Sequence, residues 1–402
     1  MIKITDFGAS TDFDNNAQYI QRAIDSLENG GSICVPSGVF LTGYINLKSN
    51  ITLYLESGAV LKAVEDASIY PKTGLYGDLN IDCNTFIYAK NCENIKICGE
   101  GTVDISSDAF LDYSVSEAEL MKFGEVAKRL PAKPLERISR PILFNNCKHI
   151  DINGIKVVNS PAWTLTFHAS DDIKVTNVTI DNNLRTPHSD GIHLSGCNGA
   201  IVSGCNFKCG DDCVAITSLH DNSYVCKNII VADCVFSSSS SAIRIGHKGS
   251  KVINVLICNI IINNTNRGFA IFAGDNGFVR NVKISHVLME TKIVSPYWWG
   301  SGEPFVICCS NSTGEISNIT LTDIRCVSEN KAVIDGNISE LKISDCSIVV
   351  NETELRKYAI KYDIAPNGYL EEENDFKGVC YIGKGVTGEI NIKENGVNSV
   401  KF

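Results

Sequence analysis

The sequence predicts an all-β protein folded as a parallel β-solenoid, a β-helix whose first coil is closed by one capping helix. Three observations carry this prediction. A short phrase of alternating Ile- or Val-rich residues, bounded by Asn or Gly, recurs along the chain. From His149 onward its copies start 23 to 36 residues apart, which is the coil length of a solenoid. The segments between the copies lack the helical periodicity of a βαβ fold.

The repeated phrase sets the expected register of the coils. Its copies begin at Asn94, His149, Asp172, Ala200, Asn228, Val252, Val279, Glu315 and Glu340. Alternate side chains should point into and out of the cylinder, and equivalent positions of adjacent coils should lie about 4.8 Å apart. We therefore expect one β-helix domain over residues 1–402, in which sequence spacing predicts distance.

Residues 1–48 form the expected N-terminal cap region. The stretch from Asp14 to Leu27 places Ile20 and Ile24 on one face and stops at Gly30-Gly31, which predicts an amphipathic helix. Such a helix would cover the unpaired strand edges of an open coil.

Three later segments interrupt the repeat. Residues 106–140 form a charged, helix-prone insertion, and residues 295–304 form a Pro/Gly-rich loop containing Trp298 and Trp299. Both are candidate walls of a groove. The tail over residues 355–402 loses the strict period, so we expect it to act as a C-terminal cap.

Composition limits the classes of partner. A net charge of −10 disfavours nucleic acid, and it requires that any anionic substrate be held by local cations. The 17 cysteines are dispersed without a paired CxxC signature, which favours reduced thiols over disulfides or a metal site. Neither a basic segment followed by an apolar run at the N-terminus nor an apolar stretch of about 20 residues is found. We expect a soluble cytoplasmic protein without a cofactor or a membrane partner, and the oligomeric state stays open.

Two segments place acids at the ends of neighbouring coils. They are His188-Ser189-Asp190-Gly191-Ile192-His193 and Cys209-Gly210-Asp211-Asp212-Cys213. If Ile192 and Val214 face the core, Asp190 lies beside Asp212, and a bend after Gly210 turns Asp211 into the same groove. Three close carboxylates raise one another's proton affinity, so that at least one stays protonated near neutrality. Glycoside hydrolysis needs such a pair of acid and base.

Other residues near this corner suit a carbohydrate ligand. His193, Ala215, Arg244 and Ala270 should form one outward row, in which the Arg244 guanidinium suits a carboxylate. Trp298 and Trp299 suit stacking on a sugar face. A purely structural interpretation stays open for each, because Asp often accepts backbone hydrogen bonds at coil corners and His and Trp often pack.

These segments resemble the polygalacturonase-like enzymes of glycoside hydrolase family 28. The resemblance also includes Thr5-Asp6-Phe7-Gly8-Ala9, the run from Asn50 to Ala59, Arg140-Pro141 and Asn159-Ser160-Pro161-Ala162-Trp163. It implies a right-handed parallel β-helix, Asp211 as general acid, and Asp190 and Asp212 as the pair that activates water for inversion. It implies no metal.

The chain departs from the family pattern at three places. The family's Gly-His-Gly motif falls on Ser240-Ser241-Ala242, and its Arg-Ile-Lys motif, which supplies two cations, falls on Ala270-Ile271-Phe272. The Asn of the first acid motif is His188. Because Arg244 lies in the row of Ala270 but one coil earlier, we hypothesise that Arg244 and His193 replace the missing cations, with His188 also contacting substrate.

The sequence therefore predicts a glycoside hydrolase acting on a pectin-like or other uronate-containing oligosaccharide. Walls at residues 106–140 and at Trp298-Trp299 favour exo action. Two alternatives stay open: a uronate lyase or epimerase that uses His188 as base, and a non-catalytic carbohydrate-binding solenoid.

Overall fold

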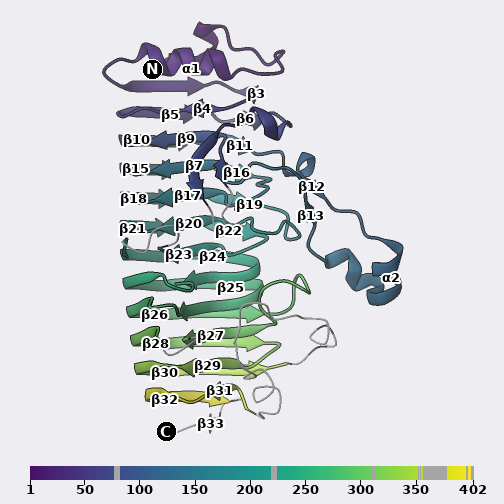
Figure 1. The fold of residues 1–402 in the computed structure, drawn as a ribbon, viewed down its shortest axis with the longest axis vertical. Helices are drawn as coiled ribbons and strands as arrows, with labels where there is room; N and C mark the ends of the chain where they lie inside the picture. Colours follow the sequence, from purple (N-terminus) through teal and green to yellow (C-terminus); the bar gives the residue numbers. More distant parts are fainter. Residues whose placement is uncertain are drawn as a thin grey trace.

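The computed structural model is a long parallel β-helix, and the predicted fold class is confirmed (Figure 1). It describes residues 1–76, 82–218, 224–309, 313–351, 353, 355, 378–394 and 397–399. Within these ranges the coils form three faces, and each strand pairs in parallel with the strands one coil before and after it.

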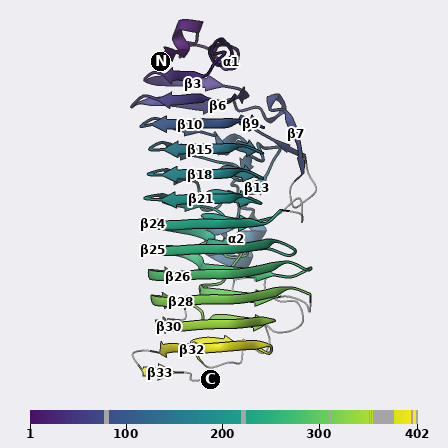
Figure 2. The ribbon, with the colours of Figure 1, turned by 90° about the vertical axis from the view of Figure 1, so that its left-hand side faces the viewer.

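The first face is turned toward the viewer in Figure 2. Its strands are β1 (Ile2–Lys3), β2 (Gly31–Val35), β5 (Ile51–Leu55), β10 (Glu93–Gly99), β15 (Lys148–Asn153), β18 (Asp171–Thr176), β21 (Asn198–Ser203) and the first parts of β24 (Cys226–Ile245), β25 (Lys251–Ala273), β26 (Phe278–Thr291), β28 (Glu315–Ser328), β30 (Ile338–Val350) and β32 (Val386–Glu394).

The second and third faces follow along each coil. The second consists of β3 (Gly38–Thr42), β6 (Ala59–Ala63), β11 (Thr102–Asp104), β16 (Lys156–Val158), β19 (Thr179–Asp181), β22 (Asn206–Cys209) and the later parts of the long strands. The third consists of β4 (Ile45–Asn46), β9 (Ile87–Lys90), β14 (Ile142–Asn145), β17 (Leu165–His168), β20 (Ile192–Ser195), β23 (Val214–Thr217), the ends of β24 and β25, and β27 (Glu303–Cys309), β29 (Ala332–Gly336) and β31 (Cys380–Ile382).

Apolar side chains stack along the interior. Ile95, Ile150 and Ile173 occupy equivalent positions of successive coils and are almost completely buried. The rings of Phe144 and Phe167 stack with centroids 5.1 Å apart. Each such side chain contributes about 1.5–3 kcal/mol through burial, so the repeated phrase is the main determinant of the fold.

An asparagine ladder fixes one corner of the coils. Asn228, Asn254, Asn281 and Asn318 have φ of 61°, 60°, 57° and 54°, a left-handed conformation that Asn tolerates. Each side-chain amide from Asn254 onward donates to the Asn one coil earlier, at 2.9–3.1 Å. The phrase starts taken from the sequence at Val252, Val279 and Glu315 lie two or three residues before this corner, so the corner and not the strand start sets the register.

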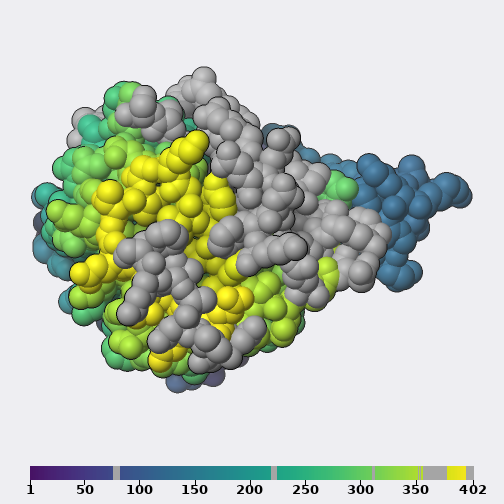
Figure 3. All heavy atoms as spheres, turned by 90° about the horizontal axis from the view of Figure 1, so that it is seen from below, coloured from purple at the N-terminus to yellow at the C-terminus, as the bar shows by residue number. Residues whose placement is uncertain are grey.

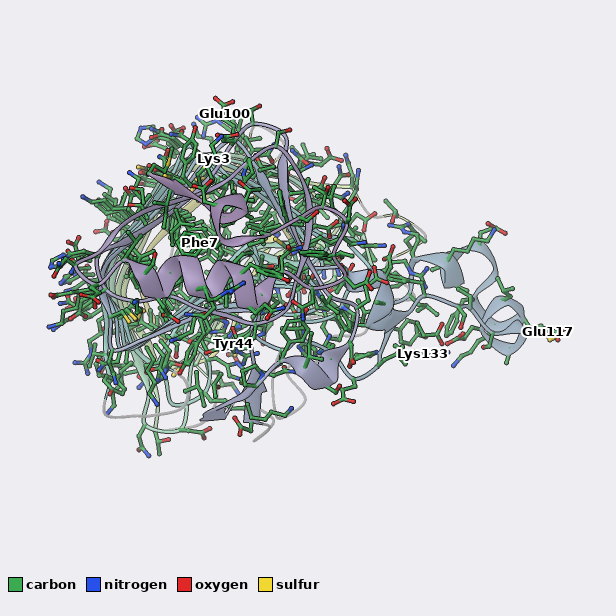
Figure 4. All side chains as sticks on the ribbon, turned by 90° about the horizontal axis from the view of Figure 1, so that it is seen from above. Lys3, Phe7, Tyr44, Glu100, Glu117 and Lys133 are labelled. Carbon is green, nitrogen blue, oxygen red and sulfur yellow. The ribbon has the colours of Figure 1, made fainter. Side chains whose placement is uncertain are left out.

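The N-terminal helix α1 spans Ala17–Ser26 and lies across the end of the β-helix (Figure 4). It begins three residues later and ends one residue earlier than the predicted helix. The buried Asn16 side chain donates to the carbonyls of Ser10 and Leu41 just before the helix. Ile20, Ala23 and Ile24 face the first coil with the turn η1 (Ile4–Phe7) beside them. Because β2, β3 and β4 already form a coil, the cap itself is shorter than residues 1–48.

The insertion lies between β11 and β14 and projects from the body as a lobe (Figures 1 and 3). It contains η3 (Ser107–Ala109), β12 (Leu111–Asp112), α2 (Glu117–Phe123), η4 (Gly124–Arg129) and β13 (Lys133–Pro134), and Glu117 lies at its far end (Figure 4). A second excursion, after η2 (Ala67–Ile69), is the hairpin of β7 (Lys72–Tyr76) and β8 (Asp82–Asn84).

The described residues of the predicted C-terminal cap continue the β-helix, and residues 356–377, 395–396 and 400–402 of that cap lie outside the described residues. β31 pairs in parallel with β29, β32 pairs in parallel with β30, and β33 (Val397–Ser399) then runs antiparallel to β32. No helix within the described ranges is long and apolar enough to cross a membrane.

Candidate active site

Three aspartates meet at one corner of the β-helix. Asp190 lies in the turn from β19 to β20, and Asp211 and Asp212 lie in the turn from β22 to β23, one coil later. The strands pair Ile192 with Val214, and the N–H of Gly191 donates to the carbonyl of Asp212 at 2.9 Å. Asp190 and Asp212 are therefore neighbours on adjacent coils, in the register that the sequence predicted.

Two glycines allow these turns to pack closely. A Cβ on Gly210 would lie 2.1 Å from the carbonyl oxygen of Thr186, and a Cβ on Gly191 would lie 2.5 Å from that of Cys213. Any larger residue would push the two coils apart, which explains the glycine in each acid segment.

All three acids are shielded from solvent. Asp190, Asp211 and Asp212 are only 1%, 5% and 2% exposed. Ionising several carboxyl groups here is costly, because each loses hydration and repels the others.

The Asp212 carboxyl group accepts hydrogen bonds from three donors. Its Oδ1 accepts from the Ser240 hydroxyl at 3.0 Å and from the Ser241 N–H at 3.1 Å, and its Oδ2 accepts from Nε of Arg244. Nη2 of Arg244 lies 4.0 Å from Asp190 Oδ2. The sequence suggested that this guanidinium binds substrate, and in the structure it faces two of the three aspartates, Asp190 and Asp212.

Asp211 has the environment of a general acid. Its Oδ1 accepts from the N–H of Asp212 at 3.0 Å and its Oδ2 from the N–H of His188 at 3.2 Å. His188 presents that N–H from a left-handed backbone with φ 60°. Burial, and then the charge of Asp212, raise the pKa of Asp211 to about 8. Asp211 therefore carries a proton at neutral pH.

His193 fixes Asp190 and reaches no solvent. Its Nδ1 lies 3.0 Å from Asp190 Oδ2, its Nε2 lies 2.9 Å from the Thr217 hydroxyl, and it is 0% exposed. Its ring stacks on Trp163 with centroids 3.6 Å apart. The direct substrate contact expected of His193 does not fit this placement, because both ring nitrogens and one ring face are occupied by protein.

Two residues behind Asp190 were not predicted as part of the site. The guanidinium carbon of Arg140 lies 3.4 Å from the centroid of Trp163, and both side chains are buried. Burial and then the charges of Asp211 and Asp212 raise the pKa of Asp190, while Arg244 and Arg140 act in the opposite direction. The coil register could have identified both residues. Arg140, Trp163, Asp190 and Asp212 each lie two residues before strand positions that pair on successive coils.

Arg137, at the end of the insertion, was also missed. Its Nη1 donates to the carbonyls of Pro161 at 2.8 Å and of Pro187 at 2.9 Å. It lies close enough to Asp211 for the two charges to interact. No repeated phrase covers this segment, so no coil register was available to place Arg137 from its position in the sequence.

His188 and the two tryptophans lie at a more exposed level. The side chain of His188 is 36% exposed, with Nδ1 3.8 Å from Asp211 Oδ2. The Trp298 ring meets His188 edge-on at 5.1 Å, and the Trp299 ring lies 5.6 Å from Trp298, both half-buried. The structure thus brings His188 and Trp298 to the acid corner, and Trp299 lies beside Trp298.

The insertion and the tryptophan loop contact each other. Arg129 donates to the carbonyls of Ile293 and Val294, and Ser295 donates back to the carbonyl of Arg129 at 2.8 Å. Phe123 packs edge-on against Tyr297 at 4.9 Å. The two expected walls therefore form one continuous structure beside the acids.

The outer surface of the third face is covered on both sides of the acid corner. Toward the N-terminus, Leu75 of the β7–β8 hairpin packs with Tyr88 and Leu143. Toward the C-terminus, Ala270 and Phe272 belong to a buried apolar cluster. Ala270 and Phe272 therefore contribute apolar packing, and neither side chain supplies a positive charge.

The arrangement can transfer a proton and activate water. Protonated Asp211 is a donor, and Asp212, neutralised by Arg244, is an acceptor. Among the described residues no group of three or more His, Cys, Asp or Glu side chains is arranged to hold a metal ion.

Comparison with known proteins gives concordant results. The sequence model described as "Glycosyl hydrolases family 28" matches residues 28–357. The chain is 26% identical over 333 residues to an endo-polygalacturonase of Pectobacterium carotovorum subsp. carotovorum, covering 79% of each protein. It is 26% identical over 343 residues to an exo-poly-alpha-D-galacturonosidase of Dickeya chrysanthemi, covering 73% of this chain and 57% of that protein. The crystal structure of a hyperthermoactive exopolygalacturonase from Thermotoga maritima superposes with a TM-score of 0.70 at 22% identity, over 87% of each chain.

Proposed function

The chain belongs to family 28 of the glycosyl hydrolases, and from this premise we propose that it removes sugars from the end of pectin-like, uronate-containing oligosaccharides with inversion. The single observation that carries the proposed mechanism is the buried cluster of three aspartates, in which Asp211 holds a proton and Asp212 faces Arg244. Family membership sets aside the lyase and the non-catalytic solenoid.

In this mechanism Asp211 protonates the leaving oxygen while a water molecule attacks the opposite side of the sugar. Asp190 and Asp212 orient that water and take its proton. Once Asp211 is protonated it no longer repels a charge on Asp190, which favours the carboxylate form of Asp190. His193 and Arg244 act as positioning residues, because each bonds directly to one of these carboxylates.

Exo action is supported by how the site is surrounded. The hairpin cluster at Tyr88 and Leu143 lies toward the N-terminus of the acid corner, and the apolar cluster at Ala270 and Phe272 lies toward the C-terminus. The joined insertion and tryptophan loop stand beside it. A long polymer would need an open groove past the acids, whereas a chain end needs only a pocket.

We also propose that the protein works in the cytoplasm on imported oligosaccharides. All 17 cysteines are free in the structure, which suits a reducing compartment. Localisation of the tagged protein in its own cells would test this.

The proposed activity is tested by a panel of defined pectic oligosaccharides. Reducing-end release should occur on uronate-containing members, and chromatography should show one monosaccharide accumulating while the substrate shortens by single units. An early mixture of intermediate lengths would reject exo action. An unsaturated, ultraviolet-absorbing product would reject hydrolysis.

A further inference from the structure

The positions that supply two cations in the resembled family are apolar here, so another cation must meet a uronate carboxylate. Ala270 and Phe272 are 0% and 7% exposed within an apolar cluster. Arg244, the expected replacement, bonds to Asp212 and lies near Asp190. A negatively charged sugar approaching three aspartates needs a positive partner whose donors are available.

Arg137 has such donors. Its Nη1 donates to the carbonyls of Pro161 and Pro187. Within the described ranges its Nε and Nη2 meet no acceptor, and they remain open to solvent on a half-buried side chain. The group therefore has one edge fixed by two loops and another edge available to a ligand.

The two carbonyls also orient this guanidinium toward the catalytic corner. Pro187 directly precedes His188, whose N–H donates to Asp211. Pro161 lies two residues before Trp163, which stacks on His193. Arg137 is thus tied to both loops that support the acids, and Asp211 lies near enough to raise the pKa of its guanidinium.

We propose that Arg137 binds the carboxylate of the substrate's uronate through its unoccupied edge, and so determines the preference for an acidic sugar. This inference rests on the proposed function. A planar guanidinium presents parallel N–H donors that match the two oxygens of a carboxylate, which a neutral sugar or a methyl ester lacks.

The charges around Arg137 favour the binding of an anion. Burial, and then repulsion from Arg140, lower the pKa of Arg137 to about 10, and Asp211 opposes this only in part. Because Asp211 is protonated at neutral pH, it offers Arg137 little compensating charge. A substrate carboxylate would supply that charge without displacing any hydrogen bond of Nη1.

The test compares acidic and neutral forms of one substrate. The kcat/KM of the wild type, Arg137→Gln and Arg137→Lys is measured on a galacturonate oligosaccharide and on its methyl-esterified form. Arg137→Gln should lower the ratio of kcat/KM on the acidic form to kcat/KM on the ester by on the order of 10- to 100-fold. Arg137→Lys should keep part of the preference, because it keeps the charge but loses the fork.

Arg185→Gln is the matched control. Arg185 also ties down the insertion through two carbonyls, donating to Leu130 at 2.7 Å and to Tyr113 at 3.0 Å. If the insertion is merely loosened, Arg185→Gln and Arg137→Gln should lower both rates alike. An unchanged preference for the acidic form in Arg137→Gln would overturn the proposal, and melting temperatures of the variants show whether they fold.

A failure of the proposed function gives a different result. If the wild type hydrolyses neither form, binding of the same two oligosaccharides is measured by calorimetry with wild type and Arg137→Gln. Loss of binding of the acidic form alone would support the carboxylate site even then. Equal binding of both forms by the wild type would reject it.

Discussion

Replacing Asp211 with Asn should stabilise the protein at neutral pH while it abolishes turnover. The carboxyl group has a pKa of about 8 in the folded protein, against the ordinary pKa of 3.8 for an exposed aspartate. The folded state therefore binds a proton that the unfolded state releases, and stability falls as pH rises from about 4 to about 8. At pH 7 this penalty reaches about 4 kcal/mol, at 1.36 kcal/mol per pH unit.

Asparagine avoids that penalty because it does not ionise. In the wild type the two carboxyl oxygens of Asp211 accept from the backbone N–H groups of Asp212 and His188. Asparagine has only one acceptor oxygen, so the variant loses one of these hydrogen bonds, which costs about 1 kcal/mol. The net gain is about 3 kcal/mol at pH 7, or roughly 3 °C in Tm for a chain of this length. Below about pH 4 the gain should reverse, because only the lost hydrogen bond remains.

Melting curves of the wild type and Asp211→Asn between pH 4 and pH 8 measure this directly. Asp108→Asn, an exposed acid in the insertion, serves as the control and should leave Tm nearly unchanged. A Tm difference for Asp211→Asn that does not change with pH would refute the assigned protonation.

Further outcomes follow from the same contacts. Asp212→Asn should lower the free energy of unfolding by about 3–5 kcal/mol, because Arg244 loses its carboxylate partner. This change is opposite in sign to that of Asp211→Asn. Denaturant unfolding measures it, and an unchanged midpoint would contradict the expected loss. His193→Phe keeps an aromatic ring stacked on Trp163 but removes the hydrogen bonds to Asp190 and Thr217. Steady-state kinetics should then show kcat falling roughly 10- to 100-fold with KM nearly constant. A change in KM alone would indicate that His193 contacts substrate instead. The pH profile of kcat/KM should decline above about pH 8, where Asp211 loses its proton, and a flat profile to pH 10 would exclude Asp211 as the acid. Asn281→Ala should lower the free energy of unfolding by about 1–2 kcal/mol, because it removes the ladder hydrogen bonds and places alanine at a positive φ. Asn281→Gly loses the same hydrogen bonds but tolerates the positive φ, so its loss should be smaller. Equal losses would mean that the side-chain amide alone accounts for the effect.

Much of the fold could be predicted because, in a solenoid, the repeat length of the sequence determines which residues lie side by side on adjacent coils. The pairing of Ile192 with Val214, and the row of His193, Ala215, Arg244 and Ala270, follow from alternation and coil length alone. The errors in register arose where the strands lengthen. Around Val252 and Val279 the true marker is the left-handed Asn at the corner, two residues further on.

The site was less predictable where contacts leave the repeat. Alternation correctly put His193 and Arg244 on the outer surface, but it carries no information on what covers that surface. Trp163 stacks on the His193 ring, and the Thr217 hydroxyl bonds to its Nε2. Arg244 bonds to Asp212. Both outward-facing side chains therefore contact protein groups at the acid corner. Arg137 lies in the insertion, whose path depends on contacts with Pro161 and Pro187 that no period encodes.

The central claim is that Asp211 donates a proton while Asp190 and Asp212 direct water to the opposite face of the sugar. Proton NMR of the newly formed anomer during hydrolysis of a defined galacturonate oligosaccharide, with the wild type and Asp211→Asn in parallel, tests it most directly. The account predicts a monosaccharide that first appears with inverted configuration and is not released by Asp211→Asn. Release with retained configuration, or an undiminished rate in Asp211→Asn, would contradict it.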